Sequence, residues 1–138
     1  MALLRSLPLF LVILLIYNAL MAVVDDMVVT LGSALFSVTL MSGAVWTLTV
    51  GDLLVLIGVV LLYMEIFKAT RTSMASVINH TLSTLVFIVF VIEFVMVKGA
   101  GTSTFLILGL MSLFDVIAGF TVTIVAARRD IGFGHSDV

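Results

Sequence analysis

Residues 27–51 read MVVTLGSALFSVTLMSGAVWTLTVG, a stretch without a charged side chain that decides the fold. By hydropathy and length alone, this stretch could be a membrane-spanning helix. Within it, however, apolar residues alternate with Ser and Thr, and a period of two residues is typical of a β-strand. The stretch therefore predicts a hairpin rather than an additional transmembrane helix.

The predicted hairpin occupies about residues 36–49, with a three-residue loop at 41–43. Gly43 suits the left-handed backbone conformation that such a loop requires. In this register Val38 pairs with Trp46 and Phe36 with Leu48, all on one face. Because an isolated hairpin is only marginally stable in water, we expect this face to lie on the mouth of the helix bundle or on another chain.

The composition of the chain is that of a membrane protein. Of the 138 residues, 63% are apolar and 10% are charged, and the mean hydropathy is +1.42. There are too few charged residues to give every helix a polar face toward water. The apolar faces must therefore contact lipid or each other. A net charge of −2 without a basic stripe excludes nucleic acid as a partner. The absence of cysteine excludes disulfides and cysteine-ligated cofactors.

Four apolar stretches surround the hairpin and predict helices. Their lengths are near the roughly 20 residues that a helix needs to cross a bilayer. Pro8 is expected in the first turn of the first helix, and Asp52 is expected to cap the second. The predicted fold class is an all-α integral membrane protein, a four-transmembrane-helix bundle with an extracytoplasmic β-hairpin between its first two helices. As one membrane domain of residues 1–138, it has helices at about 6–24, 52–67, 77–97 and 102–127, and a flexible tail at 130–138.

The positive charges set the predicted orientation, because Lys and Arg concentrate in short cytoplasmic loops. With four spans, Lys98 alone falls outside, whereas five spans would place two positive charges there. The remaining five then lie in the cytoplasm: Arg5, Lys68, Arg71, Arg128 and Arg129. We therefore expect a multi-pass protein of the plasma (inner) membrane with both termini cytoplasmic and the lipid bilayer as its surroundings.

Two predicted spans carry a carboxylate at a matched depth. Glu65 and Asp115 each lie about 20 Å below the outer end of their helix, counted at the rise of an α-helix. The third span brings His80 into the same inner half, and Lys68 lies on the same helix face as Glu65. Asp115, Glu65, His80 and Lys68 are therefore the candidate residues for handling a proton or an ion. Glu93 lies nearer the outer end and is expected to reach water.

Small residues recur on the helix faces that carry these two acids. In lipid, small side chains allow helix backbones to approach closely, so these faces are predicted to be helix contacts. The predicted packing positions are Gly109, Ser112, Gly119 and Thr123 in the last helix, and Gly51 and Gly58 in the second.

The role of the acids stays open at this level. A buried carboxylate can bind and release a proton, and this chemistry indicates a small proton or cation translocator that uses Asp115, assisted by Glu65 and His80. Alternatively, Asp115 makes a structural hydrogen bond between helices, and Glu65 pairs with Lys68. No ligand spacing supports a metal site, and no set of nucleophile, metal or phosphate-binding residues supports an enzyme or a cofactor.

The sequence favours a non-catalytic role over transport. The packing positions and the hairpin suit an accessory or assembly subunit, or a homo-oligomeric structural protein, in contact with copies of itself or with a larger membrane complex. The proton or cation translocator is the alternative hypothesis.

Overall fold

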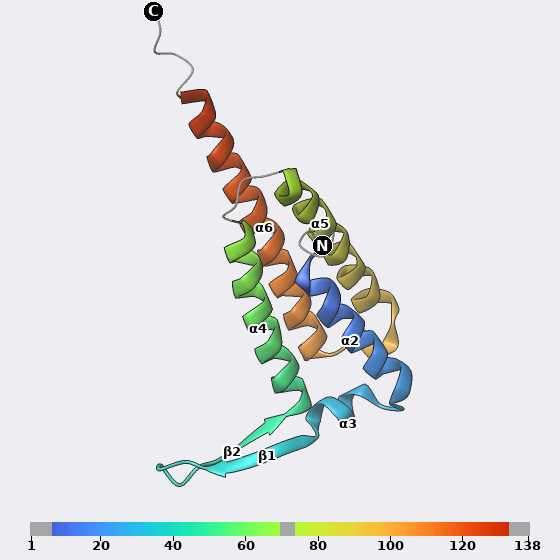
Figure 1. The fold of residues 1–138 in the computed structure, drawn as a ribbon. Helices are drawn as coiled ribbons and strands as arrows, with labels where there is room; N and C mark the ends of the chain where they lie inside the picture. Colours follow the sequence, from blue (N-terminus) through green and yellow to red (C-terminus); the bar gives the residue numbers. More distant parts are fainter. Residues whose placement is uncertain (1–6, 70–73, 133–138) are drawn as a thin grey trace, which may run out of the picture.

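A computed structural model describes residues 7–69 and 74–132, which form a helical bundle with a two-stranded hairpin at one end (Figure 1). Three of the described helices are long and apolar enough to cross a membrane, which indicates a membrane protein. The elements are α2 (Leu9–Val23), α3 (Met27–Gly32), β1 (Ala34–Thr39), β2 (Val45–Thr49), α4 (Val50–Ala69), α5 (Met74–Met96), the short 3-10 helix η1 (Lys98–Ala100) and α6 (Ser103–Gly132).

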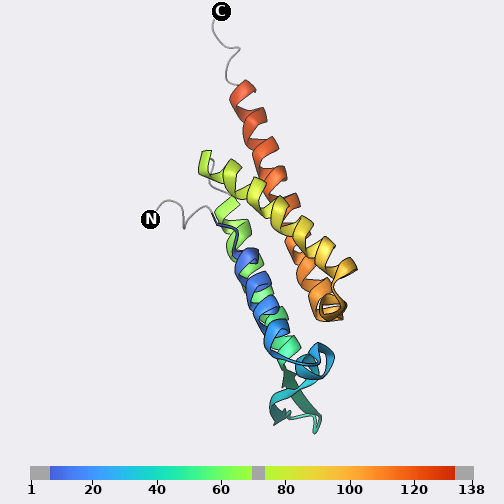
Figure 2. The ribbon, with the colours of Figure 1, turned by 90° about the vertical axis from the view of Figure 1, so that its right-hand side faces the viewer.

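The helix α6 is central in the bundle, because it packs along both α4 and α5. The shorter α2 lies alongside α4 (Figure 2) and also contacts α5. Aromatic rings fill the space between them. The ring of Phe105 lies 4.7 Å from that of Tyr17 and 5.1 Å from that of Phe90, measured between centroids. The Tyr17 hydroxyl donates to Gly99 O at 3.2 Å and hydrogen-bonds Thr102 Oγ1 at 2.6 Å, which joins the end of α2 to the start of α6.

The first helix is shorter than the predicted 6–24. Pro8 is extended (φ −68°, ψ 131°) and precedes α2, so it does not lie in the first turn as expected. At the other end Val24 is extended (φ −110°, ψ 143°) and stops the helix. The 15 residues of α2 fall below the length of the other three apolar helices.

The start of α4 forms a capping box with the last residue of β2. Thr49 Oγ1 accepts from Asp52 N at 3.1 Å, while Asp52 Oδ2 accepts from Thr49 N at 3.0 Å. This reciprocal pair satisfies two backbone donors that a helix start leaves open. Asp52 therefore caps the helix from its first turn, and α4 begins two residues before the predicted position.

The helix α6 continues past its predicted end at residue 127 and reaches Gly132. No proline interrupts the sequence there, and the positive charge of Arg128 suits the negative end of a helix dipole. The first residues of the predicted tail, 130–132, are consequently helical, and residues 133–138 lie outside the described residues.

The one-turn helix α3 was not predicted. It forms because Asp26 accepts hydrogen bonds from Val28 N at 2.8 Å and Val29 N at 3.1 Å, which caps the helix start. Met27 and Leu31, one turn apart, are buried against the core. The helix was missed because it is only six residues long and three of them are β-branched.

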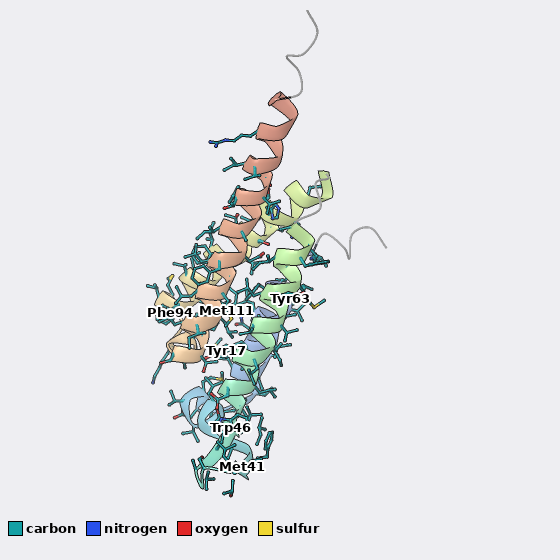
Figure 3. The ribbon with its side chains drawn as sticks, turned by 90° about the vertical axis from the view of Figure 1, so that its left-hand side faces the viewer. Tyr17, Met41, Trp46, Tyr63, Phe94 and Met111 are labelled. Atoms are coloured by element: carbon teal, nitrogen blue, oxygen red, sulfur yellow. The ribbon has the colours of Figure 1, made fainter. Side chains whose placement is uncertain are left out.

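The hairpin has the predicted register. Phe36 pairs with Leu48 and Val38 with Trp46, and Gly43 in the loop has φ +84°. The structure does not place its apolar face on the mouth of the bundle, and contact of this face with another chain stays a prediction. Leu48 is buried, but the other three members of the face are about half exposed, and Figure 3 places Trp46 beyond the ends of the packed helices. The strand direction set by the start of α4 turns the hairpin away from the bundle.

Candidate functional site

Six polar side chains are buried between α4, α5 and α6, far from the hairpin. All are at most 4% exposed, although the helices around them are apolar. We call them the polar cluster: Glu65, Asn79, His80, Ser83, Ser112 and Asp115. Buried polar groups normally need hydrogen-bond partners, so the partners of each residue distinguish a structural role from a functional one.

Glu65 is the most fully bonded member of the cluster. Its Oε1 accepts from the backbone N of Leu9, and from Lys68 Nζ at 3.1 Å. Its Oε2 accepts from Asn79 Nδ2 at 3.2 Å. Lys68 Nζ also donates to the backbone O of Leu7 at 3.1 Å. The Glu65 carboxylate therefore caps the start of α2 from a neighbouring helix, where Pro8 offers no side-chain cap.

Asp115 lies in a different environment, although it is just as deeply buried, at 1% exposure. Neither of its carboxylate oxygens accepts a hydrogen bond from the residues that the structure describes. The Ser83 hydroxyl of α5 is a neighbour, in a geometry short of a full hydrogen bond. Ser112, one turn earlier on α6, also has an unbonded hydroxyl among the described residues. Asp115 thus has neighbouring hydroxyls but no donor bound to it.

His80 packs against α6 at a glycine. A Cβ added at Gly119 would come within 3.0 Å of three atoms of the His80 ring, so the imidazole occupies the space that a side chain would fill. Gly119 is one helical turn beyond Asp115 on α6. The charges of Glu65 and Lys68 act on both His80 and Asp115. The four predicted ion-handling residues are therefore brought together at one end of the bundle.

Some of the predicted packing positions lie at close contacts between helices, and others do not. A Cβ at Gly58 would lie 2.7 Å from Leu108 Cδ2, and one at Gly51 would lie 2.9 Å from Thr104 Oγ1, so both glycines bring α4 close to α6. Gly109 has ordinary contacts, with Phe90 Cβ 3.6 Å away. Thr123 is exposed and donates its hydroxyl to Gly119 O of its own helix at 2.9 Å, so it is not part of a helix contact.

Glu93 has a partner on α2. Its Oε2 accepts from Asn18 Nδ2 at 2.9 Å. Among the described residues, no group of three His, Cys, Asp or Glu side chains is arranged to hold a metal ion.

Asn79 is the cluster member that sequence reasoning missed. It precedes Ser83 by one helical turn and so lies on the same face of α5. Its Nδ2 donates to Glu65, while its Oδ1 accepts no hydrogen bond from the described residues. The spacing of Asn79 and Ser83 along an apolar helix was the available signal.

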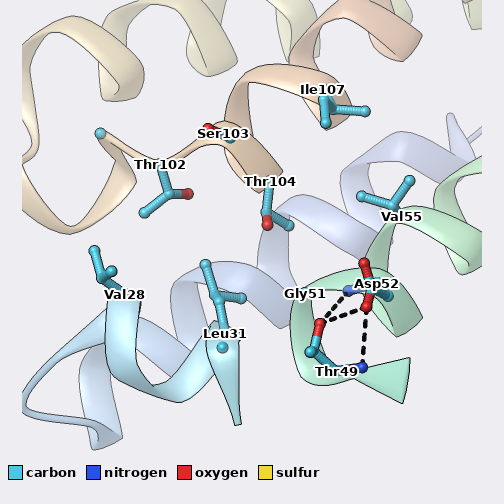
Figure 4. A pocket seen from close by; sticks show the side chains of 12 residues that line it. Val28, Leu31, Thr49, Gly51, Asp52, Val55, Thr102, Ser103, Thr104 and Ile107 are labelled. Atoms are coloured by element: carbon cyan, nitrogen blue, oxygen red, sulfur yellow. Dashed lines mark hydrogen bonds between the residues drawn. The ribbon is translucent and has the colours of Figure 1, made fainter. Parts of the chain in front are cut away.

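Apart from the polar cluster, a recess of about 500 Å³ opens at the hairpin end between α3, the start of α4 and the start of α6 (Figure 4). Its lining includes Asp52, Thr104 and Ile107. The Asp52 carboxylate there is bonded to both the backbone N and the hydroxyl of Thr49, as the dashed lines show. These bonds complete the cap of α4, so the acid of this recess has a structural role.

The polar cluster is therefore the candidate functional site, because Asp115 and its neighbours have buried polar atoms that make no hydrogen bond with a described residue. Comparison of the chain with protein-family models, with curated protein sequences and with solved structures gives no match.

Proposed function

We propose that this chain is a multi-pass membrane protein that binds a proton or a small monovalent cation at Asp115 and moves it across the bilayer. The observation that carries the proposal is the burial of Asp115, without a hydrogen bond from any described residue, between three apolar helices. The partners of Glu65 give that acid a structural role, and so the geometry favours transport at Asp115 over a purely structural reading of both acids.

The energetic argument concerns the charge of Asp115. An ionised carboxylate at the centre of a bilayer costs roughly 2.5–3.5 kcal/mol on insertion scales. Three donors offset this cost at Glu65. At Asp115 a bound proton or cation would remove the charge, and the Ser83 and Ser112 hydroxyls would provide additional oxygens around it. Loading and release of that ion would then be the transport step.

His80 is the proposed relay between Asp115 and the cytoplasmic side. It packs against Gly119, one turn farther along α6, on the side toward Lys68 and Arg128. An imidazole can accept and donate a proton near neutral pH, which suits a relay. Glu65 assists by holding Lys68 and Asn79 in place.

The proposed topology has four spans, with α2 as the shortest. Its start is capped by Glu65 of α4, and Tyr17 in its middle hydrogen-bonds Thr102 just before α6, so α2 lies along α4. With α4, α5 and α6 across the bilayer, the distribution of Lys and Arg places both termini in the cytoplasm and the hairpin outside. We propose the plasma membrane as the location and no enzymatic activity.

Ion flux into proteoliposomes tests the proposal. The purified chain is reconstituted, and an imposed pH, sodium or potassium gradient is followed with a dye inside the vesicles. We expect flux for the wild type and for Glu93→Gln, a matched change of a carboxylate outside the polar cluster, and a loss of flux for Asp115→Asn. Infrared spectroscopy adds an independent readout, because the carbonyl band of a protonated carboxyl should disappear in Asp115→Asn. Flux that persists in Asp115→Asn, or no wild-type flux under any gradient, would reject transport at this site.

A second candidate function is an accessory or assembly subunit, or a homo-oligomer. The observation that favours it is a groove of about 440 Å³ between α2 and α5, which is lined by leucine and valine side chains and contains the Asn18–Glu93 pair. A polar pair that faces lipid is costly, so a helix of a second copy would stabilise it. Native mass spectrometry of the protein extracted in mild detergent distinguishes the cases. A reproducible second polypeptide or a closed oligomer supports this candidate, and a monomer contradicts it.

A further inference from the structure

The hairpin exposes an apolar face that no described part of the chain covers. Phe36, Val38 and Trp46 are 51%, 45% and 46% exposed. The rings of Phe36 and Trp46 pack edge to face, with centroids 5.9 Å apart. On the opposite face, the hydroxyls of Ser37 and Thr47 hydrogen-bond at 2.8 Å. The hairpin is therefore a ribbon with one apolar face and one hydroxyl-bearing face.

No linker separates this ribbon from α4. β2 ends at Thr49 and α4 begins at Val50, whose backbone N donates to Ser33 O at 3.1 Å. Figure 1 shows the hairpin extending sideways from this end of α4, away from α2 and α5. With α4 across the bilayer, the hairpin would start at the membrane surface and run over the lipid beside the bundle.

The hairpin is better suited to the membrane interface than to water or to the hydrocarbon core. An isolated two-stranded hairpin is only marginally stable in water, where its apolar face would stay exposed. The hydrocarbon core would leave the outer backbone N–H and C=O groups of both strands without partners. The headgroup region supplies water for these groups and an apolar boundary for aromatic rings, and tryptophan is enriched there. No charge in residues 27–51 opposes this position.

We propose that the face formed by Phe36, Val38 and Trp46 docks on the lipid surface, at the boundary between the headgroups and the acyl chains. The lipid is that of the bilayer in which the helices lie, so this inference rests on the membrane-spanning part of the proposed function and not on ion transport at Asp115. The docked hairpin holds the start of α4 at a defined depth. Because α4 is continuous, this also sets the depth of Glu65 and of the polar cluster.

The chain offers a direct probe, because Trp46 is its one tryptophan. The wild-type protein is reconstituted into phosphatidylcholine vesicles whose lipids carry bromine either close to the headgroup or near the end of the acyl chain. We expect the emission of Trp46 to be quenched strongly by the shallow bromine, less by the deep bromine and little by aqueous iodide. Circular dichroism and flotation of the same vesicles verify that the helices are folded and inserted.

Three other results would overturn the proposal. Strong quenching by iodide without quenching by brominated lipid would place the hairpin in water. Protection from both quenchers would mean that protein, either a second copy or another partner, covers the face. Stronger quenching by the deep bromine would place the indole inside the hydrocarbon core.

A double variant provides the matched control. Trp46→Phe combined with Thr47→Trp moves the indole to the opposite face at the neighbouring position of the same strand. We expect this indole to be quenched more by iodide and less by shallow bromine than Trp46, and equal quenching would contradict the docking of one particular face. Asp115→Asn should leave the quenching of Trp46 unchanged, which separates this inference from the transport proposal.

Discussion

At one end of the bundle six polar side chains are buried between apolar helices, whereas at the other end the hairpin exposes aromatic and aliphatic side chains. Each end inverts the pattern of a water-soluble protein, in which polar groups face the solvent. In a bilayer, the space between helices is where polar groups can find partners, and the interface is where aromatic side chains are favoured. A lipid bilayer around the helices therefore accounts for both the buried polar side chains and the exposed apolar ones.

Within the polar cluster, a second contrast separates Glu65 from Asp115. Both acids are almost completely buried, but Glu65 accepts three hydrogen bonds while Asp115 accepts none from the described residues. Burial alone therefore does not reveal whether an acid supports the fold. The number of donors at each carboxylate does, and the substitutions Glu65→Ala and Asp115→Asn measure the difference between the two acids.

The largest expected effect belongs to Glu65→Ala. This change leaves Asn79 Nδ2 and the Leu9 backbone N without their acceptor, while Lys68 Nζ keeps the backbone O of Leu7. Each buried donor that is left without an acceptor costs about 1–3 kcal/mol of the free energy of unfolding. Thermal unfolding in detergent, followed by circular dichroism, should show a large decrease in Tm. Glu93→Ala is the control, because Glu93 is only partly buried and accepts one side-chain hydrogen bond, from Asn18, among the described residues. Equal decreases in Tm for the two variants would contradict the inference that Glu65 stabilises the fold more than Glu93 does.

The next effect concerns the contact between α5 and α6. Gly119→Ala places a Cβ inside the space of the His80 ring, and overpacking of this kind costs about 1–3 kcal/mol. Gly109→Ala on the same helix is the control, because its Cβ would meet Phe90 at an ordinary 3.6 Å. The difference in Tm between the two variants measures how tightly His80 is held. Identical Tm values would show that the imidazole moves aside without cost.

A smaller effect is expected at the hairpin loop. Gly43 has φ +84°, and an L side chain in this region costs roughly 1–2 kcal/mol. Gly43→Ala should loosen the hairpin while leaving the helices intact, which would increase amide hydrogen exchange in β1 and β2 only. Gly32→Ala tests the specificity, because Gly32 has no left-handed backbone and nothing within 4 Å of an added Cβ. Faster exchange in both variants would argue against a role for the loop conformation.

The smallest change in stability is expected for Asp115→Asn. The amide keeps the shape of the carboxyl group and breaks no hydrogen bond with a described residue, so the free energy of unfolding should change by less than about 1 kcal/mol. The measurement is the same unfolding experiment as for Glu65→Ala. A loss as large as that of Glu65→Ala would break the contrast between the two acids and assign Asp115 a structural role.

Local sequence signals were sufficient for the hairpin. Alternation of apolar and hydroxyl side chains specified which residues share a face, and Gly43 specified the turn, so the pairs Phe36–Leu48 and Val38–Trp46 follow from neighbours in the chain. The apolar runs likewise indicated α4, α5 and α6, although capping and the absence of a stop signal moved their ends by a few residues. Such features depend on interactions within one or two turns.

The tertiary structure alone decided the hydrogen-bond partners of the acids and the direction of the hairpin. Glu65 obtains a donor from Leu9, 56 residues away, and this contact depends on how α2 and α4 pack. Helical spacing placed Asp115 on an inward face. The sequence near Asp115 did not show which side chains of α5 would face it. The hairpin points away from the bundle because its strands continue the start of α4. Hydrogen bonds and docking between distant segments depend on the relative rotation and position of whole helices, which a local pattern does not contain.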